Sequence, residues 1–235
     1  MMIRKIGIIG AMEEEVEALR DRLVRPQRLT RASMDFYSGT LEGHEVVIVR
    51  SGIGKVNAGI CTQILADVFQ VDAVINTGIA GSLDARIDIG DIVISTDTVQ
   101  HDMDATGFGY DPGVIPRMET SFFKADNRLV EAAEAACREA VPDVNVFTGR
   151  IVSGDQFVAD RETKNRISSR FDGLCTEMEG AAIAQAAWLN GIPFVIIRAI
   201  SDKADDSATV DYPTFERQAI EHSVALVRNF VGRLA

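Results

Sequence analysis

The chain has 235 residues, 46% of them hydrophobic, which is enough to bury the core of a single domain over residues 1–235. With 35 acidic against 24 basic residues, the net charge of −11 argues against nucleic acid or an anionic membrane as partner, because both require clustered Lys and Arg. The three cysteines lack the spacing of a zinc site and suit free thiols, and no apolar run approaches the length of a membrane span, so we expect a cytoplasmic protein.

Short β-branched runs alternate with helical patterns along the chain. Strands are predicted over residues 3–10, 45–52, 72–78, 91–96, 145–154 and 193–201. Helices are predicted over residues 12–23, 56–69, 125–140, 177–190 and 212–234. This alternation predicts an α/β fold, in which a mixed, mostly parallel central sheet is flanked by helices.

Two long irregular stretches interrupt this pattern, at residues 98–126 and 201–213. Loops of this length in a compact domain are usually functional or disordered. The first stretch carries several aromatic and aliphatic residues and is too apolar for a solvated linker. We expect a ligand, a partner subunit or the protein's own core to cover it.

Acidic residues gather where predicted strands end, which is where open α/β sheets bind their ligands. Glu15 follows the first strand, Asp202 follows the last, and Glu179 begins a helix. Each could simply stabilise a helix N-terminus or a turn, and for the neighbouring Glu13 and Glu14 this interpretation is preferred. Three acids on one edge, without grouped Cys or His, nevertheless predict a carboxylate site that holds no metal.

The glycine motifs and the histidine at position 101 are weaker signals. GIIGAM lacks the dinucleotide-binding fingerprint, and SGIGK lacks the remaining residues of a P-loop, so both are interpreted as strand-to-helix turns. His101 is interpreted as a structural hydrogen-bonding residue. The chain also has no G-x-S-x-G motif for a serine nucleophile.

Six motifs taken together resemble one enzyme family. They are GIIGAMEEEV, SGIGKVNA, NTGIAGSL, IVSGDQFV, TEMEGAAIA and RAISDKAD, and the match runs from about residue 3 to residue 234. In this combination the chain resembles the 5′-methylthioadenosine/S-adenosylhomocysteine nucleosidases of the nucleoside phosphorylase/nucleosidase superfamily.

The resemblance implies a nucleoside phosphorylase-like fold and hydrolysis of the N-glycosidic bond of 5′-methylthioadenosine and S-adenosylhomocysteine, and also of 5′-deoxyadenosine. It implies no cofactor and no metal, and a place in methionine salvage. It further implies a homodimer in which a loop of one subunit completes the other's site.

The resemblance also implies roles for individual residues. Glu15 would be the base that activates water, and Asp202 the general acid at N7 of adenine, supported by Ser201. Glu179 would hold the ribose hydroxyls beside Met178. The other expected substrate-binding residues are Phe157 and Val158 at the adenine, Ile53, Phe108 and Pro116 around the 5′ group, and Ile79, Gly81, Glu177 and Arg198 lining the site.

The chemistry requires such an arrangement independently of the resemblance. Breaking an N-glycosidic bond builds positive charge on the sugar and negative charge on the purine, so an acid is needed at the base and anions near the ribose. The acids of MEEE would repel a phosphate dianion, which favours water as the nucleophile. The alternatives are a related purine nucleoside hydrolase or phosphorylase, for example one acting on aminodeoxyfutalosine, or a non-catalytic nucleoside-binding protein.

Overall fold

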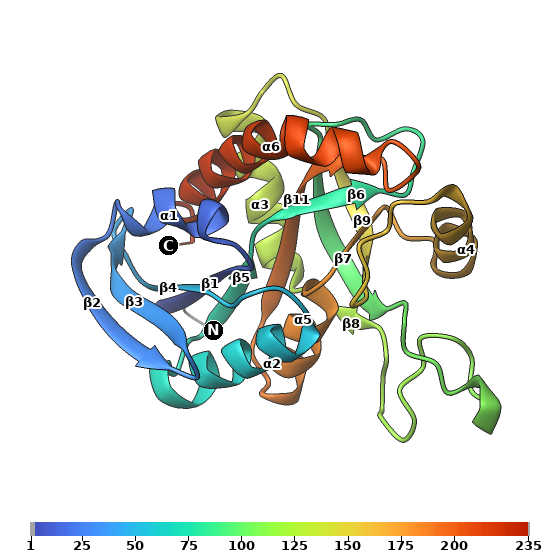
Figure 1. The fold of residues 1–235 in the computed structure, drawn as a ribbon. Coiled ribbons are helices and arrows are strands. Elements are labelled where there is room, and N and C mark those ends of the chain that lie inside the picture. The colour runs from blue at the N-terminus through green and yellow to red at the C-terminus, as the bar shows by residue number, and fades with distance from the viewer. Residues whose placement is uncertain (1–2, 235) are drawn as a thin grey trace.

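The centre of the computed structural model, which describes residues 3–234, is a mixed sheet of 11 strands (Figure 1). The strands are β1 (Lys5–Gly10), β2 (Val24–Arg31), β3 (Met34–Leu41), β4 (His44–Arg50), β5 (Ala73–Asn76), β6 (Ile79–Ser82), β7 (Ile92–Gln100), β8 (Phe123–Lys124), β9 (Val146–Ser153), β10 (Cys175–Glu177) and β11 (Phe194–Asp202). Their order in the sheet is β2-β3-β4-β1-β5-β11-β6-β10-β9-β7-β8. A further pairing of β7 with β11 closes five strands into a ring.

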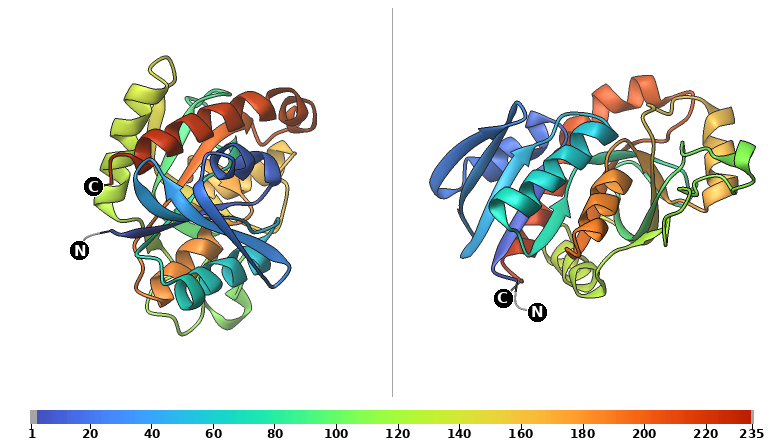
Figure 2. Two further views of the ribbon diagram at one scale, coloured as in Figure 1. Left: turned by 90° about the vertical axis from the view of Figure 1, so that its left-hand side faces the viewer. Right: turned by 90° about the horizontal axis from the view of Figure 1, so that it is seen from below.

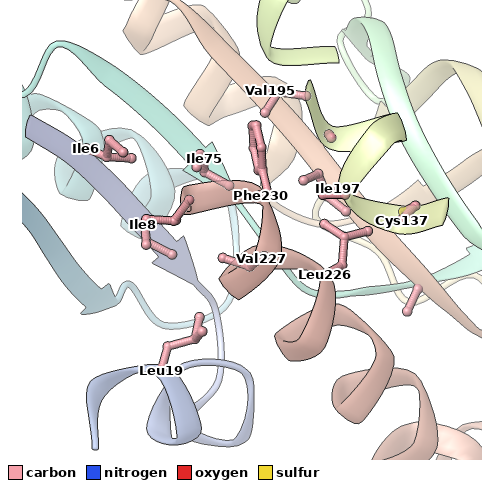
Figure 3. Packing of buried hydrophobic residues seen from close by; sticks show 14 of the residues in the cluster. Ile6, Ile8, Leu19, Ile75, Cys137, Val195, Ile197, Leu226, Val227 and Phe230 are labelled. Atoms are coloured by element: carbon pink, nitrogen blue, oxygen red, sulfur yellow. The ribbon is translucent and has the colours of Figure 1, made fainter. Parts of the chain in front are cut away.

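Helices cover both faces of this sheet (Figure 2). They are α1 (Glu13–Arg20), α2 (Lys55–Ile64), which continues into the π-helical turn η1 (Leu65–Phe69), α3 (Asn127–Ala140), α4 (Arg161–Phe171), α5 (Gly180–Leu189) and α6 (Ala208–Val231), together with the 3₁₀ turn η2 (Thr106–Phe108). Residues of α1, α3 and α6 pack on one face and residues of α2 and α5 on the other. Figure 3 shows Leu226, Val227 and Phe230 of α6 packed against sheet residues.

The α/β fold with a mixed, mostly parallel sheet is confirmed, and each predicted core strand has an observed counterpart. Five strands and one helix escaped the sequence prediction: β2, β3, β6, β8, β10 and α4. β2 is an exposed, arginine-containing edge strand, and β6 and β10 are only 4 and 3 residues long. Apolar periodicity cannot detect such strands, because backbone pairing with neighbours rather than a buried face defines them.

Three predicted boundaries were wrong. The predicted helix 177–190 begins only at Gly180, because Cys175–Glu177 forms β10 between β6 and β9. The predicted loop 98–126 contains the end of β7, the turn η2 and the short strand β8. The predicted loop 201–213 is also shorter, because Ser201 and Asp202 belong to β11 and α6 begins at Ala208.

Candidate active site

A cavity of about 440 Å³ lies at the carboxyl ends of β1, β10 and β11. It is lined by Ala11, Met12, Glu15, Ile53, Ile79, Ala80, Gly81, Gln156, Phe157, Val158, Thr176, Glu177, Met178, Glu179, Ser201, Asp202 and Tyr212. This volume is within the usual range for sites that bind small molecules. Residues widely separated in the sequence, including all three predicted acids, therefore share one pocket.

Three of the predicted site residues are not part of the cavity wall. Arg198 is buried behind it, only 2% exposed. Phe108 and Pro116 lie on the long segment between β7 and β8, and Phe108 is 87% exposed. The sequence analysis missed six lining residues, namely Ala11, Met12, Ala80, Gln156, Thr176 and Tyr212. Three of these, Ala80, Gln156 and Thr176, directly adjoin predicted residues, whereas only the folding of α6 over the sheet brings Tyr212 to the cavity.

Both carboxylate oxygens of Glu15 accept hydrogen bonds from backbone N–H groups. Its Oε2 accepts the N–H groups of Ala11 at 2.6 Å and Met12 at 3.0 Å, and its Oε1 accepts that of Ile79 at 3.3 Å. Gly78 leaves room for the carboxylate, since a Cβ there would lie 2.6 Å from Oε1. Burial raises the pKa of Glu15, although the charge of Arg198 and the backbone donors oppose the shift.

Asp202 sits at the end of β11 with one partner on each oxygen. Oδ1 accepts the N–H of Ala204 at 2.8 Å, and Oδ2 accepts the hydroxyl of Ser201 at 2.9 Å. A Cβ at Gly81 would lie 2.7 Å from Oδ1, so the glycine allows the paired strands β6 and β11 to approach here. Burial raises the pKa of Asp202 against these hydrogen bonds, which favours a carboxyl group that keeps its proton.

Glu179 and Glu177 lie side by side at the N-terminus of α5. The Glu177 carboxylate accepts the N–H of Gly180 at 2.7 Å and forms a buried ion pair with Arg198. Glu179 accepts the N–H of Gly54 at 2.7 Å. Burial and the negative charge of Glu177 raise the pKa of Glu179 to about 8. Glu177 and Arg198 thus form a buried ion pair next to Glu179.

Two aromatic side chains form one wall of the cavity. Phe157 is 51% exposed, and its ring meets that of Tyr212 edge to face with centroids 5.6 Å apart. The Tyr212 hydroxyl lies 3.0 Å from a carboxylate oxygen of Glu216 and 3.4 Å from the sulfur of Met12. An exposed aromatic face beside buried acids is suited to a planar, polar ligand such as a purine.

Neither lysine nor arginine is among the lining residues within the described part of the chain. Arg198 and Lys55, which adjoin loops and strands of the cavity, are both paired, Arg198 with Glu177 and Lys55 with Asp102. Over residues 3–234, no group of three His, Cys, Asp or Glu residues is arranged to hold a metal ion. None of the helices in that range is long and apolar enough to cross a membrane.

The fold is that of a large class of enzymes. The family model of the phosphorylase superfamily matches residues 5–232, which is nearly the whole chain. The match covers every strand of the sheet and every residue that lines the cavity.

Individual relatives narrow this class. A 5′-methylthioadenosine/S-adenosylhomocysteine nucleosidase of Halalkalibacterium halodurans is 47% identical over 98% of this chain and 99% of its own. The structure of such a nucleosidase from Colwellia psychrerythraea 34H in complex with adenine has a TM-score of 0.95 at 41% identity, covering 99% of this chain and 96% of its own. The structure of the enzyme of Neisseria meningitidis in complex with methylthio-immucillin-A has a TM-score of 0.94 at 40% identity, and the match covers 98% of this chain and 99% of that chain. The chain belongs to the 5′-methylthioadenosine/S-adenosylhomocysteine nucleosidase family.

Proposed function

We propose that this protein hydrolyses the N-glycosidic bond of 5′-methylthioadenosine and S-adenosylhomocysteine, and also of 5′-deoxyadenosine, to adenine and the 5-substituted ribose. The observation that carries the proposal is the convergence of Glu15, Glu179 and Asp202 in one cavity whose lining, within residues 3–234, contains no cation. The relatives described above support it through their names and through the adenine and methylthio-immucillin-A complexes.

Asp202 acts as the general acid in this mechanism. Adenine leaves as a neutral molecule only if a ring nitrogen is protonated as the bond breaks, and we assign this proton transfer to N7. The raised pKa of Asp202 keeps its proton available closer to neutral pH. Ser201 and the N–H of Ala204 hold the carboxyl group in place, while Phe157 stacks on the purine and the backbone of Val158 contacts its edge.

Glu15 and Glu179 act on the sugar side. Glu15 is the base that removes a proton from the attacking water, and its raised pKa makes it a stronger base than an exposed carboxylate. Glu179 holds the ribose hydroxyls, with Met178 packed beside the sugar. The Glu15 carboxylate also stabilises the positive charge that develops on the ribose. The side chain of Ile79 cannot hydrogen-bond to the water, so its contribution is the backbone N–H that it donates to Glu15.

Water rather than phosphate is the nucleophile in this proposal. A phosphorylase needs cations with free donors to hold the dianion. Here the Arg198 guanidinium is buried outside the cavity wall, where it contacts Glu177 and Asn76, and the Lys55 ammonium is paired with Asp102. Glu15 adds a further negative charge at the place where phosphate would have to bind.

We further propose a single-domain, cytoplasmic homodimer that acts in methionine salvage. Ile53 is 55% exposed at the cavity and Phe108 is 87% exposed on the long segment, so both apolar side chains are available to a second copy of the chain. In the dimer, Phe108 and Pro116 of one subunit would cover the 5′ end of the ligand in the other, beside Ile53.

The test is adenine release by the purified protein in phosphate-free buffer. We expect turnover of 5′-methylthioadenosine, S-adenosylhomocysteine and 5′-deoxyadenosine that does not change when phosphate is added. Turnover that requires phosphate would establish a phosphorylase, and turnover of 6-amino-6-deoxyfutalosine alone would establish a different hydrolase. Binding of these nucleosides without cleavage would indicate a non-catalytic protein.

A further inference from the structure

Three charged residues outside the cavity form a closed ring of contacts between separate strand ends. Lys55 begins α2 after β4, Asp102 follows β7, and Asp155 follows β9. The Lys55 ammonium lies 2.6 Å from Oδ1 of Asp102, whose Oδ2 accepts the N–H of Asp155 at 2.9 Å. Oδ1 of Asp155 accepts the N–H of Lys55 at 2.9 Å. Each residue of this ring therefore contacts both of the others.

The ring joins the turn before α2, which contacts Glu179, to the loop after β9 that carries the proposed adenine contacts. Gly54, directly before Lys55, donates its N–H to Glu179. On the other side, Asp155 directly precedes the cavity-lining residues 156–158. None of the three ring residues lines the cavity in the part of the chain that the structure describes. The ring therefore makes no contact with a ligand in the cavity and acts on the reaction through the placement of these loops.

Partial burial makes the Lys55–Asp102 pair of the ring stiffer than an ion pair on the surface, whereas Asp155 is exposed. The side chains of Lys55 and Asp102 are each 17% exposed, and the ammonium also contacts Oε1 of Gln100 at 3.0 Å. Solvent screens such charges weakly, and removing one partner leaves the other charge uncompensated. Gly54 has φ of 96°, and a Cβ there would lie 3.2 Å from Oδ1 of Asp155. The turn and the ring together restrict the arrangement of the two loops.

We propose that Lys55, Asp102 and Asp155 are positioning residues that set the separation between Glu179 at the ribose and the adenine-stacking loop at Phe157. This inference rests on the proposed function. Cleavage needs the sugar and the purine held at once, and a misplacement of about 1 Å can cost about 100-fold in rate. Free adenine contacts only the purine side of the cavity, so its affinity depends little on the ring.

Two single variants and their combination test this inference. Asp102→Asn turns an amide toward the Lys55 ammonium, and Lys55→Met removes the ammonium itself. Each is expected to lower kcat/KM for 5′-methylthioadenosine by about tenfold or more, while the inhibition constant of adenine changes by less than about threefold. The double variant is expected to lose no more than the worse single variant, because the residues act as one unit.

Asp97→Asn is the matched control. It breaks the partly buried ion pair between Asp97, which is 18% exposed, and Arg150, which is 28% exposed. Neither residue lines the cavity. We expect a fall in Tm similar to that of Asp102→Asn, with kcat/KM within about twofold of the wild type. The inference is overturned if both ring variants keep kcat/KM within that range, or if adenine affinity falls in proportion to it. A wild-type protein that cleaves no nucleoside would instead overturn the proposed function.

Discussion

Replacing Asp202 by Asn removes a dissociable proton while preserving the local structure. In the wild type, Oδ1 lies 2.8 Å from the nitrogen of Ala204 and Oδ2 lies 2.9 Å from the Ser201 hydroxyl. In the variant, the amide oxygen can still accept the N–H of Ala204, and the amide nitrogen can donate to the Ser201 hydroxyl. The hydroxyl can then turn toward the carbonyl of Ala80, which lies 3.4 Å away. Since no buried polar group loses its partner, the free energy of unfolding should change by less than about 1 kcal/mol.

The catalytic cost of this substitution should be far larger. General acid catalysis contributes about 10²–10⁴-fold, so the barrier to glycosidic cleavage by Asp202→Asn should rise by about 3–5 kcal/mol. The assay measures adenine release and thermal unfolding on the same preparation. A kcat within about threefold of the wild type, with Tm unchanged, would refute the assignment of Asp202 as the acid.

Three further predictions concern other groups of the site. Glu15→Gln should abolish adenine release, whereas Glu14→Gln, at an exposed neighbouring position, should keep kcat within about twofold of the wild type. Equal losses of kcat in the two variants would contradict the assignment of Glu15 as the base. Since the pKa of Glu179 is raised from 4.5 to about 8, the unfolded chain loses this proton first and stability falls as pH rises through that range. Glu179→Gln should therefore gain Tm relative to the wild type between about pH 5 and about pH 9, and a constant difference would contradict the shift. Heterodimers of an Asp202→Asn chain and a Phe108→Ala chain should regain activity, because one site per dimer is then intact; verified heterodimers without rescue would exclude shared sites.

The sequence predicts most of the fold because its central strands are buried on both faces. β11 is buried along its whole length, and its apolar run has the pattern of a covered parallel strand. The edge strand β2 is exposed at nearly every residue, so no apolar pattern distinguishes it from a loop. β10 has only 3 residues, and its pairing with β6 and β9 is a product of the tertiary structure.

The same limit applies to the cavity. Glu15 follows β1 and Asp202 is the last residue of β11, so parallel packing alone places them at one edge of the sheet. Tyr212 lies on α6, and only the packing of that helix across the sheet brings its ring against Phe157. The partners of buried charges, such as Glu177 for Arg198, also depend on distances that no single sequence supplies.

A structure of the Asp202→Asn variant with bound 5′-methylthioadenosine tests the central claim most directly. It should place the amide of residue 202 at N7 of the purine, Glu179 at the ribose hydroxyls, and Glu15 beside a water molecule that faces the anomeric carbon. A nucleoside bound elsewhere, or bound in this cavity with the three acids away from these atoms, would contradict the account.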